Sequence, residues 1–320
     1  MTLPASGAIS IGDIATEFGF AQTNISFSSL YRANGYTSGA VAANGIANIS
    51  SNFSISQSGQ IDLGQFYSAQ KGFKYVANIT TATANYVLSD AANTAGWNGI
   101  IPIDATITID SSQFVYATST SAAAFRITPS GTLAGGSVSR VRLINNGVIS
   151  GKGGYGGPGS SGGENGGPGL SADGLGYPID VNNLGTVAGG GGGGGGGTSG
   201  TGTDGGEGTA SYGAGGGGGG AGYSGGAGGG GSGGNYPGGT GGTGSWNAGG
   251  GGGGGGSGNG VSAGPGGSGG SAGNNGSNGS GGSNLSNANG PWGGGAGGSA
   301  SINSSNITWV NTGSRLGAIS

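Results

Sequence analysis

The stretch that decides the fold reads Gly213-Ala-Gly-Gly-Gly-Gly-Gly-Gly-Ala-Gly-Tyr-Ser-Gly-Gly-Ala-Gly-Gly-Gly-Gly-Ser-Gly-Gly234, with glycine at every third position eight times in succession. The same spacing returns seven times from Gly264 through Gly282. A period of three is typical of a threefold extended helix that rises about 3.1 Å per residue and makes no internal hydrogen bonds. Such a helix persists only where neighbours take up its N–H and C=O groups. The stretch therefore predicts a bundle of packed polyglycine II helices.

Other glycine-rich structures fit the sequence less well. Of the 92 glycines in 320 residues, 75 lie between residues 151 and 300. Collagen is excluded because only six prolines lie in that range. A calcium-binding β-roll needs repeated acidic residues, and none follows Glu207. A flexible glycine-serine linker is the alternative that composition alone leaves open.

The uninterrupted glycine runs predict which helices lie inside the bundle. A face that touches a neighbouring backbone must carry no Cβ, so a helix of glycine alone can be contacted on every side. We therefore expect 189–197, 215–220 and 249–256 to be central, and the runs that carry Ser, Ala or Asn to be peripheral.

The regions that flank the glycine block predict a β domain. Residues 71–150 are rich in β-branched and aromatic residues, and Ile103–Ile109 and Val138–Ile144 alternate apolar with polar side chains. We expect an antiparallel domain of five to seven strands. Ile307–Val310 reads as a further strand, so residues 301–320 should complete this domain beside Val141–Ile149, with 151–300 inserted between.

The first 70 residues contain a degenerate repeat, at Ile9–Ile14, Ile25–Tyr31 and Ile61–Tyr67. In each copy a Ser or Asp stands in a position to cap a short helical turn. We expect a small N-terminal module with short helical turns. Two interpretations stay open, a separate small domain and a docking module for a partner protein.

Composition excludes several classes of function. The chain has no His and no Cys, and only 6% of its residues are charged. Zinc, haem and thiol enzymes are therefore excluded, and we expect no metal, cofactor or catalytic residue.

The eight Lys and Arg are scattered, which disfavours nucleic acid as a partner. No apolar run approaches the length of a membrane-spanning helix, and the start lacks a signal peptide. The acidic residues of 151–300 form no convincing pair for glycan hydrolysis.

Three segments and the glycine tracts together resemble the glycine-rich adhesins at the tips of bacteriophage tail fibres. The segments are Leu3-Pro-Ala-Ser-Gly-Ala-Ile-Ser-Ile-Gly-Asp-Ile14, Val141-Arg-Leu-Ile-Asn-Asn-Gly-Val-Ile-Ser-Gly-Lys-Gly-Gly154 and Ile307-Thr-Trp-Val-Asn-Thr-Gly-Ser-Arg-Leu-Gly317. The resemblance implies a polyglycine II sandwich whose loops bind an outer-membrane protein or a surface glycan. It also implies a virion protein, made in the host cytoplasm, whose residues 1–70 attach to a tail-fibre or baseplate protein.

The candidate receptor-binding side chains lie in the interruptions of the glycine block. If successive turns alternate between the two ends of the bundle, the odd-numbered interruptions lie at the distal end. The even-numbered ones, which include Thr198–Asp204, Tyr223 and Trp246, lie near the base. The candidates are Tyr177, Ile179, Tyr212, Tyr236, Val261, Leu285 and Trp292. For each aromatic residue the alternative is a cap over the open end of the bundle. Two other functions stay open, an ice-binding protein and a structural virion component that binds no receptor.

Overall fold

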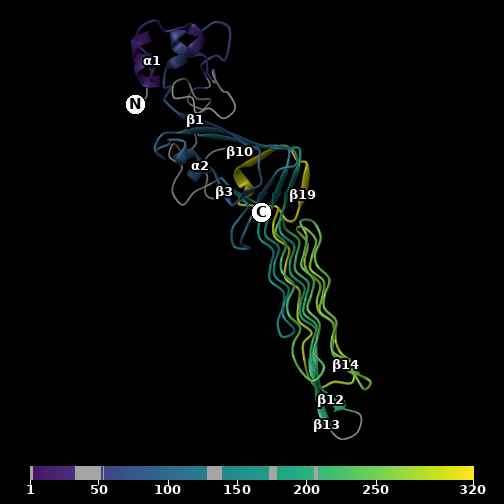
Figure 1. Ribbon diagram of the computed structural model, residues 1–320. Coiled ribbons are helices and arrows are strands. Elements are labelled where there is room, and N and C mark those ends of the chain that lie inside the picture. The colour runs from purple at the N-terminus through teal and green to yellow at the C-terminus, as the bar shows by residue number, and fades with distance from the viewer. Residues whose placement is uncertain (1–2, 33–51, 53, 128–138, 173–178, 205–207) are drawn as a thin grey trace.

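The protein is an elongated molecule in which three parts follow one another along one axis (Figure 1). The computed structural model describes residues 3–32, 52, 54–127, 139–172, 179–204 and 208–320. A helical module lies at one end, a region of short strands follows, and a long glycine bundle forms the other end (Figure 1).

Each of the three N-terminal repeats forms a short helix. They are α1 (Ile11–Phe18) and the 3₁₀ helices Phe27–Leu30 and Leu63–Phe66. Ser10 caps α1 in a capping box with Asp13. The apolar positions of the repeats face one another and build a core of their own, separate from the core of the strand region. Its buried members are Leu3, Ile14, Phe18, Leu30, Ile55, Phe66 and Ala69.

The strand region is a parallel β-solenoid of three sheets, so the expectation of an antiparallel domain is wrong. The first sheet contains β1 (Phe73–Ile79), β4 (Ile103–Ile109), β7 (Arg140–Asn145), β10 (Ile179–Asn183) and β18 (Ile307–Asn311). The second contains β2 (Thr83–Ala84), β5 (Phe114–Tyr116), β8 (Val148–Ser150), β11 (Thr186–Ala188) and β19 (Ser314–Leu316). The third contains β3 (Tyr86–Val87), β6 (Phe125–Arg126), β9 (Leu170–Ser171) and β17 (Ser301–Ile302). Every pairing within these sheets is parallel.

The chain visits the three sheets in turn, and each circuit stacks on the previous one. Strands that line a solenoid alternate inward and outward side chains as half-buried antiparallel strands do, so the alternation predicted the strands and not their direction. Ile107, Leu143 and Val181 are direct partners in successive strands and are fully buried. The short helix α2 (Leu88–Thr94) buries Leu88 and Ala92 against the same core.

β18 pairs with β10, and β10 pairs with β7. The expected pairing of the C-terminal strand beside Val141–Ile149 is therefore wrong by one strand. The reason is that Ile179–Asn183, which lies inside the glycine block in the sequence, supplies a strand that the prediction placed in a loop.

A buried asparagine marks the corner after the first sheet in successive circuits. Asn145 Nδ2 donates to Asn183 Oδ1 at 2.8 Å, and Asn183 Nδ2 donates to the carbonyl oxygen of Thr312 at 2.8 Å. A glycine follows two residues after each of these asparagines. A Cβ on Gly147 would lie 2.6 Å from the carbonyl oxygen of Asp110 in the circuit below, so this close stacking requires glycine.

Extended glycine-rich segments run side by side away from the solenoid (Figure 1). They are residues 151–158, 162–168, 189–198, 213–221, 225–233, 237–245, 249–256, 263–271, 275–282 and 290–299. The first two leave and re-enter between β8 and β9, and the others lie between β11 and β17. The glycine block is therefore two insertions on the same side of the solenoid.

Backbone hydrogen bonds join these segments with a period of three. Successive donors reach three different neighbours, and the fourth returns to a neighbour already used. The pairs are Gly191 to Ala221, Gly192 to Asn274, Gly193 to Glu164 and Gly194 to Gly218, and the first and the fourth acceptor both lie in segment 213–221. A β-strand would instead alternate between two neighbours in one plane.

Segments 189–198 and 213–221 lie inside the bundle, and every residue from 189 to 197 is buried. Segment 189–198 donates to three neighbouring segments and accepts from three others. The expectation that 249–256 is also central is wrong. Gly251 and Gly254 are exposed, and a Cβ on either would meet no atom within 4 Å. An uninterrupted glycine run permits central packing without requiring it.

Candidate functional site

The turns farthest from the solenoid carry short strands. β12 (Ser199–Asp204) forms a three-stranded antiparallel sheet with β13 (Gly208–Tyr212) on one side and β16 (Ser286–Asn289) on the other. β14 (Ser257–Gly258) and β15 (Val261–Ser262) form a small hairpin nearby. β12, β13 and β14 lie at the far end of the bundle, opposite the N-terminal module (Figure 1).

An apolar cluster closes this distal end. The rings of Tyr212 and Tyr236 stack with centroids 4.8 Å apart and an interplanar angle of 7°. Tyr212 is 1% exposed, and its hydroxyl donates to the carbonyl oxygen of Gly258 at 3.2 Å. Val261 and Leu285 pack in the same cluster. These side chains shield the open end of the bundle from water.

The structure thus brings four of the predicted site residues together, Tyr212, Tyr236, Val261 and Leu285. Tyr212 and Val261 are buried, so their side chains present almost no surface to another molecule. Trp292 is the third residue of segment 290–299, at the same end of the bundle, and is half-buried. Its indole N–H is buried and has no acceptor among the described residues.

Ile179 does not lie in a distal loop. It is the first residue of β10 and is fully buried in the solenoid core, so we no longer count it as a receptor-binding residue. Tyr177 lies outside the described residues. Conversely, Thr198–Asp204, expected at the base, contains β12 at the distal end. The turn that the prediction missed lies at 158–161. The prediction also counted one turn too many, because it placed 198–204 and 210–212 at opposite ends, whereas β12 and β13 pair at the distal end. The missed turn and this extra turn offset each other, so the turns after Tyr212 lie at their predicted ends.

A sequence signal for the β10 strand existed. Three segments share an apolar-polar alternation followed by Asn-x-Gly. They are Val141-Arg-Leu-Ile-Asn-Asn-Gly147, Ile179-Asp-Val-Asn-Asn-Leu-Gly185 and Ile307-Thr-Trp-Val-Asn-Thr-Gly313. This repeat identifies the solenoid circuits and removes 179–183 from the set of loops.

Asparagine side chains hold the distal loops in place. Asn235 Oδ1 accepts from the amide and the hydroxyl of Ser211, and Asn284 Nδ2 donates to the carbonyl oxygen of Gly260 at 2.8 Å. Asn259, Asn284 and Asn287 adopt left-handed backbone conformations, which asparagine tolerates better than most residues. The loops are therefore ordered by side-chain hydrogen bonds and not by the glycine packing alone.

At the other end of the bundle, aromatic residues join the glycine segments to the solenoid. Tyr223 stacks on Tyr116 at 4.1 Å between centroids and contacts Phe114, which also meets the edge of Trp246. Lys152 lies nearby, where its ammonium donates to the carbonyl oxygens of Ser224 at 2.7 Å and Gly225 at 2.8 Å. Burial lowers the pKa of Lys152.

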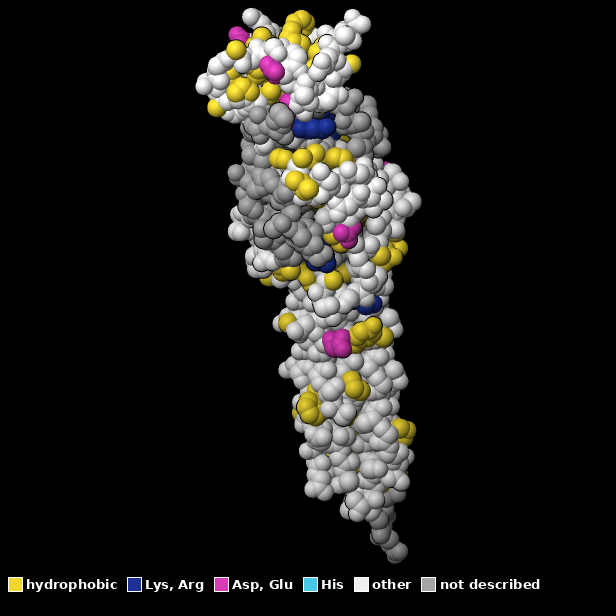
Figure 2. Space-filling view, turned by 90° about the vertical axis from the view of Figure 1, so that its left-hand side faces the viewer, with side chains coloured by type: hydrophobic (Ala, Val, Ile, Leu, Met, Phe, Trp, Pro, Cys, Tyr) yellow, Lys and Arg dark blue, Asp and Glu magenta, His cyan; other side chains and the backbone are white. Residues whose placement is uncertain are grey.

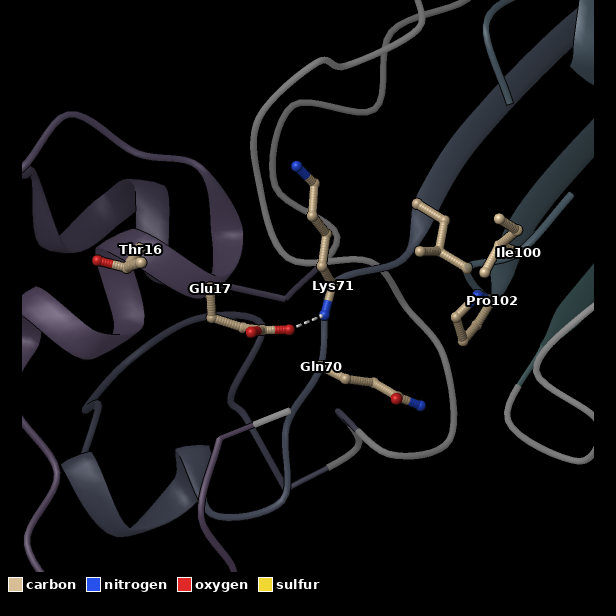
Figure 3. Close-up of a pocket in the computed structure, with 7 residues that line it drawn as sticks. Thr16, Glu17, Gln70, Lys71, Ile100 and Pro102 are labelled. Atoms are coloured by element: carbon tan, nitrogen blue, oxygen red, sulfur yellow. Dashed lines mark hydrogen bonds between the residues drawn. The ribbon is translucent and has the colours of Figure 1, made fainter. Parts of the chain in front are cut away.

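Two ion pairs lie on the first sheet, and a pocket lies where the N-terminal module meets the strand region. Arg142 pairs with the buried carboxylate of Asp104 at 2.8 Å, and Arg140 pairs with Asp180 at 3.0 Å. A pocket lies between α1 and the loop before β4, where Glu17 accepts a hydrogen bond from the backbone of Lys71 (Figure 3). The described residues hold no cluster of three potential metal ligands.

Comparison with known proteins identifies the family. The sequence matches the phage tail fibre adhesin Gp38 family over residues 74–320, and the chain therefore belongs to that family. This confirms the resemblance stated above and makes the chain a component of a virion tail. No described helix is long and apolar enough to cross a membrane.

A similar solved structure is the gp37-gp38 adhesin tip complex of the bacteriophage S16 long tail fibre. The identity is 22%, with 82% of this chain and 87% of that chain covered, and the TM-score is 0.45. No curated protein sequence matches the chain.

Proposed function

We propose that this adhesin recognises a bacterial outer-membrane protein or surface glycan through the distal loops of its glycine bundle. The observation that carries the proposal is the gathering of β12, β13, β14, β15 and β16 at the end of the molecule farthest from the N-terminal module. Loops on a rigid support are where recognition residues are most often found.

The bundle acts as a rigid spacer built of polyglycine II helices. Hydrogen bonding with a period of three supports this assignment, because a threefold helix directs successive N–H groups about 120° apart. Rigidity follows from close packing, since a Cβ on most central glycines would overlap a backbone carbonyl of a neighbouring segment.

The N-terminal module attaches the adhesin to a tail-fibre or baseplate protein. The module has its own core and lies outside the residues that match the family. Its surface carries exposed apolar side chains, with Phe27 62% exposed and Ile11 and Leu63 exposed as well. Exposed apolar residues of this kind suit a protein interface. No enzymatic step is part of the proposed function.

The test is binding of the fluorescently labelled full chain to a panel of Gram-negative strains, together with competition against adsorption of the phage that carries it. A variant that carries Ser286→Ala, Asn287→Gly and Asn289→Ala should lose binding and competition while keeping its melting temperature. If the unmodified chain binds no strain that its phage infects, the protein is a structural component and the proposal is wrong.

A further inference from the structure

The distal end of the bundle has almost no charge. No Lys or Arg occurs between residues 153 and 314. The last acidic residues of the sequence are Asp204, at the end of β12, and Glu207, which lies outside the described residues. On the face shown in Figure 2 the distal part of the bundle carries no dark blue and no magenta side chain. Phosphate and carboxylate groups are usually bound by Arg or Lys, so this surface is not built for an anionic ligand.

The distal end also lacks the apolar anchors that dominate protein interfaces. Large apolar side chains are exposed on the N-terminal module, on the solenoid, at the base of the bundle and, at Tyr155, part-way along it. Among the described residues, none of these exposed side chains lies in the distal turns. Tyr212 and Val261, which had been candidates for that role, are buried in the cap. Protein partners are normally held by such anchors.

Strand addition by a receptor segment is hindered as well. β16 is an edge strand, since the sheet order is β13-β12-β16. Asn287 has a left-handed backbone with φ of 49°, and the register of β16 against β12 shifts between Ser199 and Thr201. An irregular edge of this kind interrupts the row of backbone groups that an added strand would need.

The groups that remain available are amides and hydroxyls. All four residues of β16 are exposed. The side-chain amides of Asn287 and Asn289 make no hydrogen bond within the described residues. An amide offers a donor and an acceptor side by side, which suits neighbouring hydroxyl groups of a sugar. The half-buried ring of Trp292, three residues after Asn289, suits the apolar face of a sugar ring.

We propose that the surface around β16 binds a neutral, hydroxyl-rich glycan of the bacterial surface, with Asn287 and Asn289 as specificity-determining contacts. This inference rests on the proposed receptor-binding function and narrows it to one class of ligand. A neutral glycan would be held by hydrogen bonds without charge attraction, so the binding affinity should be nearly independent of ionic strength.

The experiment uses a strain that binds the labelled full chain. Its cells are treated with sodium periodate, which cleaves vicinal diols of sugars, or with a broad-specificity protease. Periodate should abolish binding and protease should leave it unchanged, and polysaccharide purified from the same strain should compete. Between about 50 and 500 mM NaCl the affinity should change less than about twofold, because screening acts only on charged contacts.

Matched variants locate the contacts. Asn287→Gly keeps the left-handed backbone, and together with Asn289→Ala it should weaken binding by about tenfold or more. Asn247→Ala removes an exposed asparagine at the base of the bundle and should leave binding unchanged.

Binding that survives periodate and is lost with protease would overturn the inference while leaving the receptor-binding function intact. Weakening of about tenfold by salt would also overturn it. A chain that binds no strain contradicts the proposed function itself.

Discussion

At the scale of single residues, the central glycines limit what the bundle tolerates. A Cβ on Gly193 would overlap the carbonyl of Tyr155, and the three atoms nearest to it would all be backbone atoms. We predict that Gly193→Val lowers the melting temperature by about 10 °C or more, whereas Ser268→Val, at an exposed position, changes it by less than about 3 °C. Calorimetry of the two variants checks this. Similar shifts would contradict the layering of the bundle.

Lys74 gives the solenoid a dependence on pH. The residue is 1% exposed, and burial lowers its pKa from 10.5 to about 8. Between these values the unfolded chain binds more protons than the folded one, so the free energy of unfolding rises with pH. We predict that the stability of the wild type relative to Lys74→Met increases between about pH 8 and 10.5, by up to about 3 kcal/mol. Denaturant titrations across this range check it, and a constant difference would contradict it.

At the scale of elements, asparagines complete the hydrogen bonding of a glycine segment at the surface of the bundle. In 290–299, Gly294 donates to Asn278 Oδ1 at 3.0 Å and Gly297 donates to Asn275 Oδ1 at 2.8 Å. We predict that the double variant Asn275→Ala, Asn278→Ala speeds amide exchange at these two glycines by about tenfold, because each lost bond is worth about 1 kcal/mol. Exchange at Gly295, which donates to Gly193, should change less. Unchanged exchange at Gly294 and Gly297 would show that solvent replaces the amides without loss.

At the scale of the whole molecule, the two ends of the bundle carry aromatic residues with different tasks. Trp246 and Tyr223 join the bundle to the solenoid, whereas Tyr212 caps the distal end. We predict that Trp246→Ala lowers stability by about 1–2 kcal/mol and leaves cell binding per folded molecule unchanged. Thermal unfolding and cell binding of the purified variant check both parts. Loss of binding in a stably folded Trp246→Ala protein would place a receptor contact at the base.

The distal cap couples stability to the receptor surface. Tyr212 is fully packed, so Tyr212→Ala should lower stability by about 3 kcal/mol or more and disorder the hairpin β12–β13. Tyr212→Phe, which keeps the stacked ring and loses one hydrogen bond, should cost about 1 kcal/mol. Denaturant unfolding distinguishes the two. Equal, small effects would mean that the tyrosine pair does not support the end of the bundle.

The sequence by itself determined where the glycine segments lie, where most of them turn, and which residues alternate into a β core. Each of these features is local, because a period of three or two is a property of consecutive residues. Only the tertiary structure decided that the sheets are parallel, that Ile179–Asn183 is a strand of the solenoid, and that 249–256 lies at the surface. It also decided that Tyr212 closes the bundle and that the exposed distal groups are asparagine amides. The alternation of apolar and polar residues, together with the glycine content, determines which faces of a strand or a glycine segment can be buried. The choice of neighbour depends on segments more than a hundred residues apart, whose hydrogen bonds form only once the solenoid has brought them together.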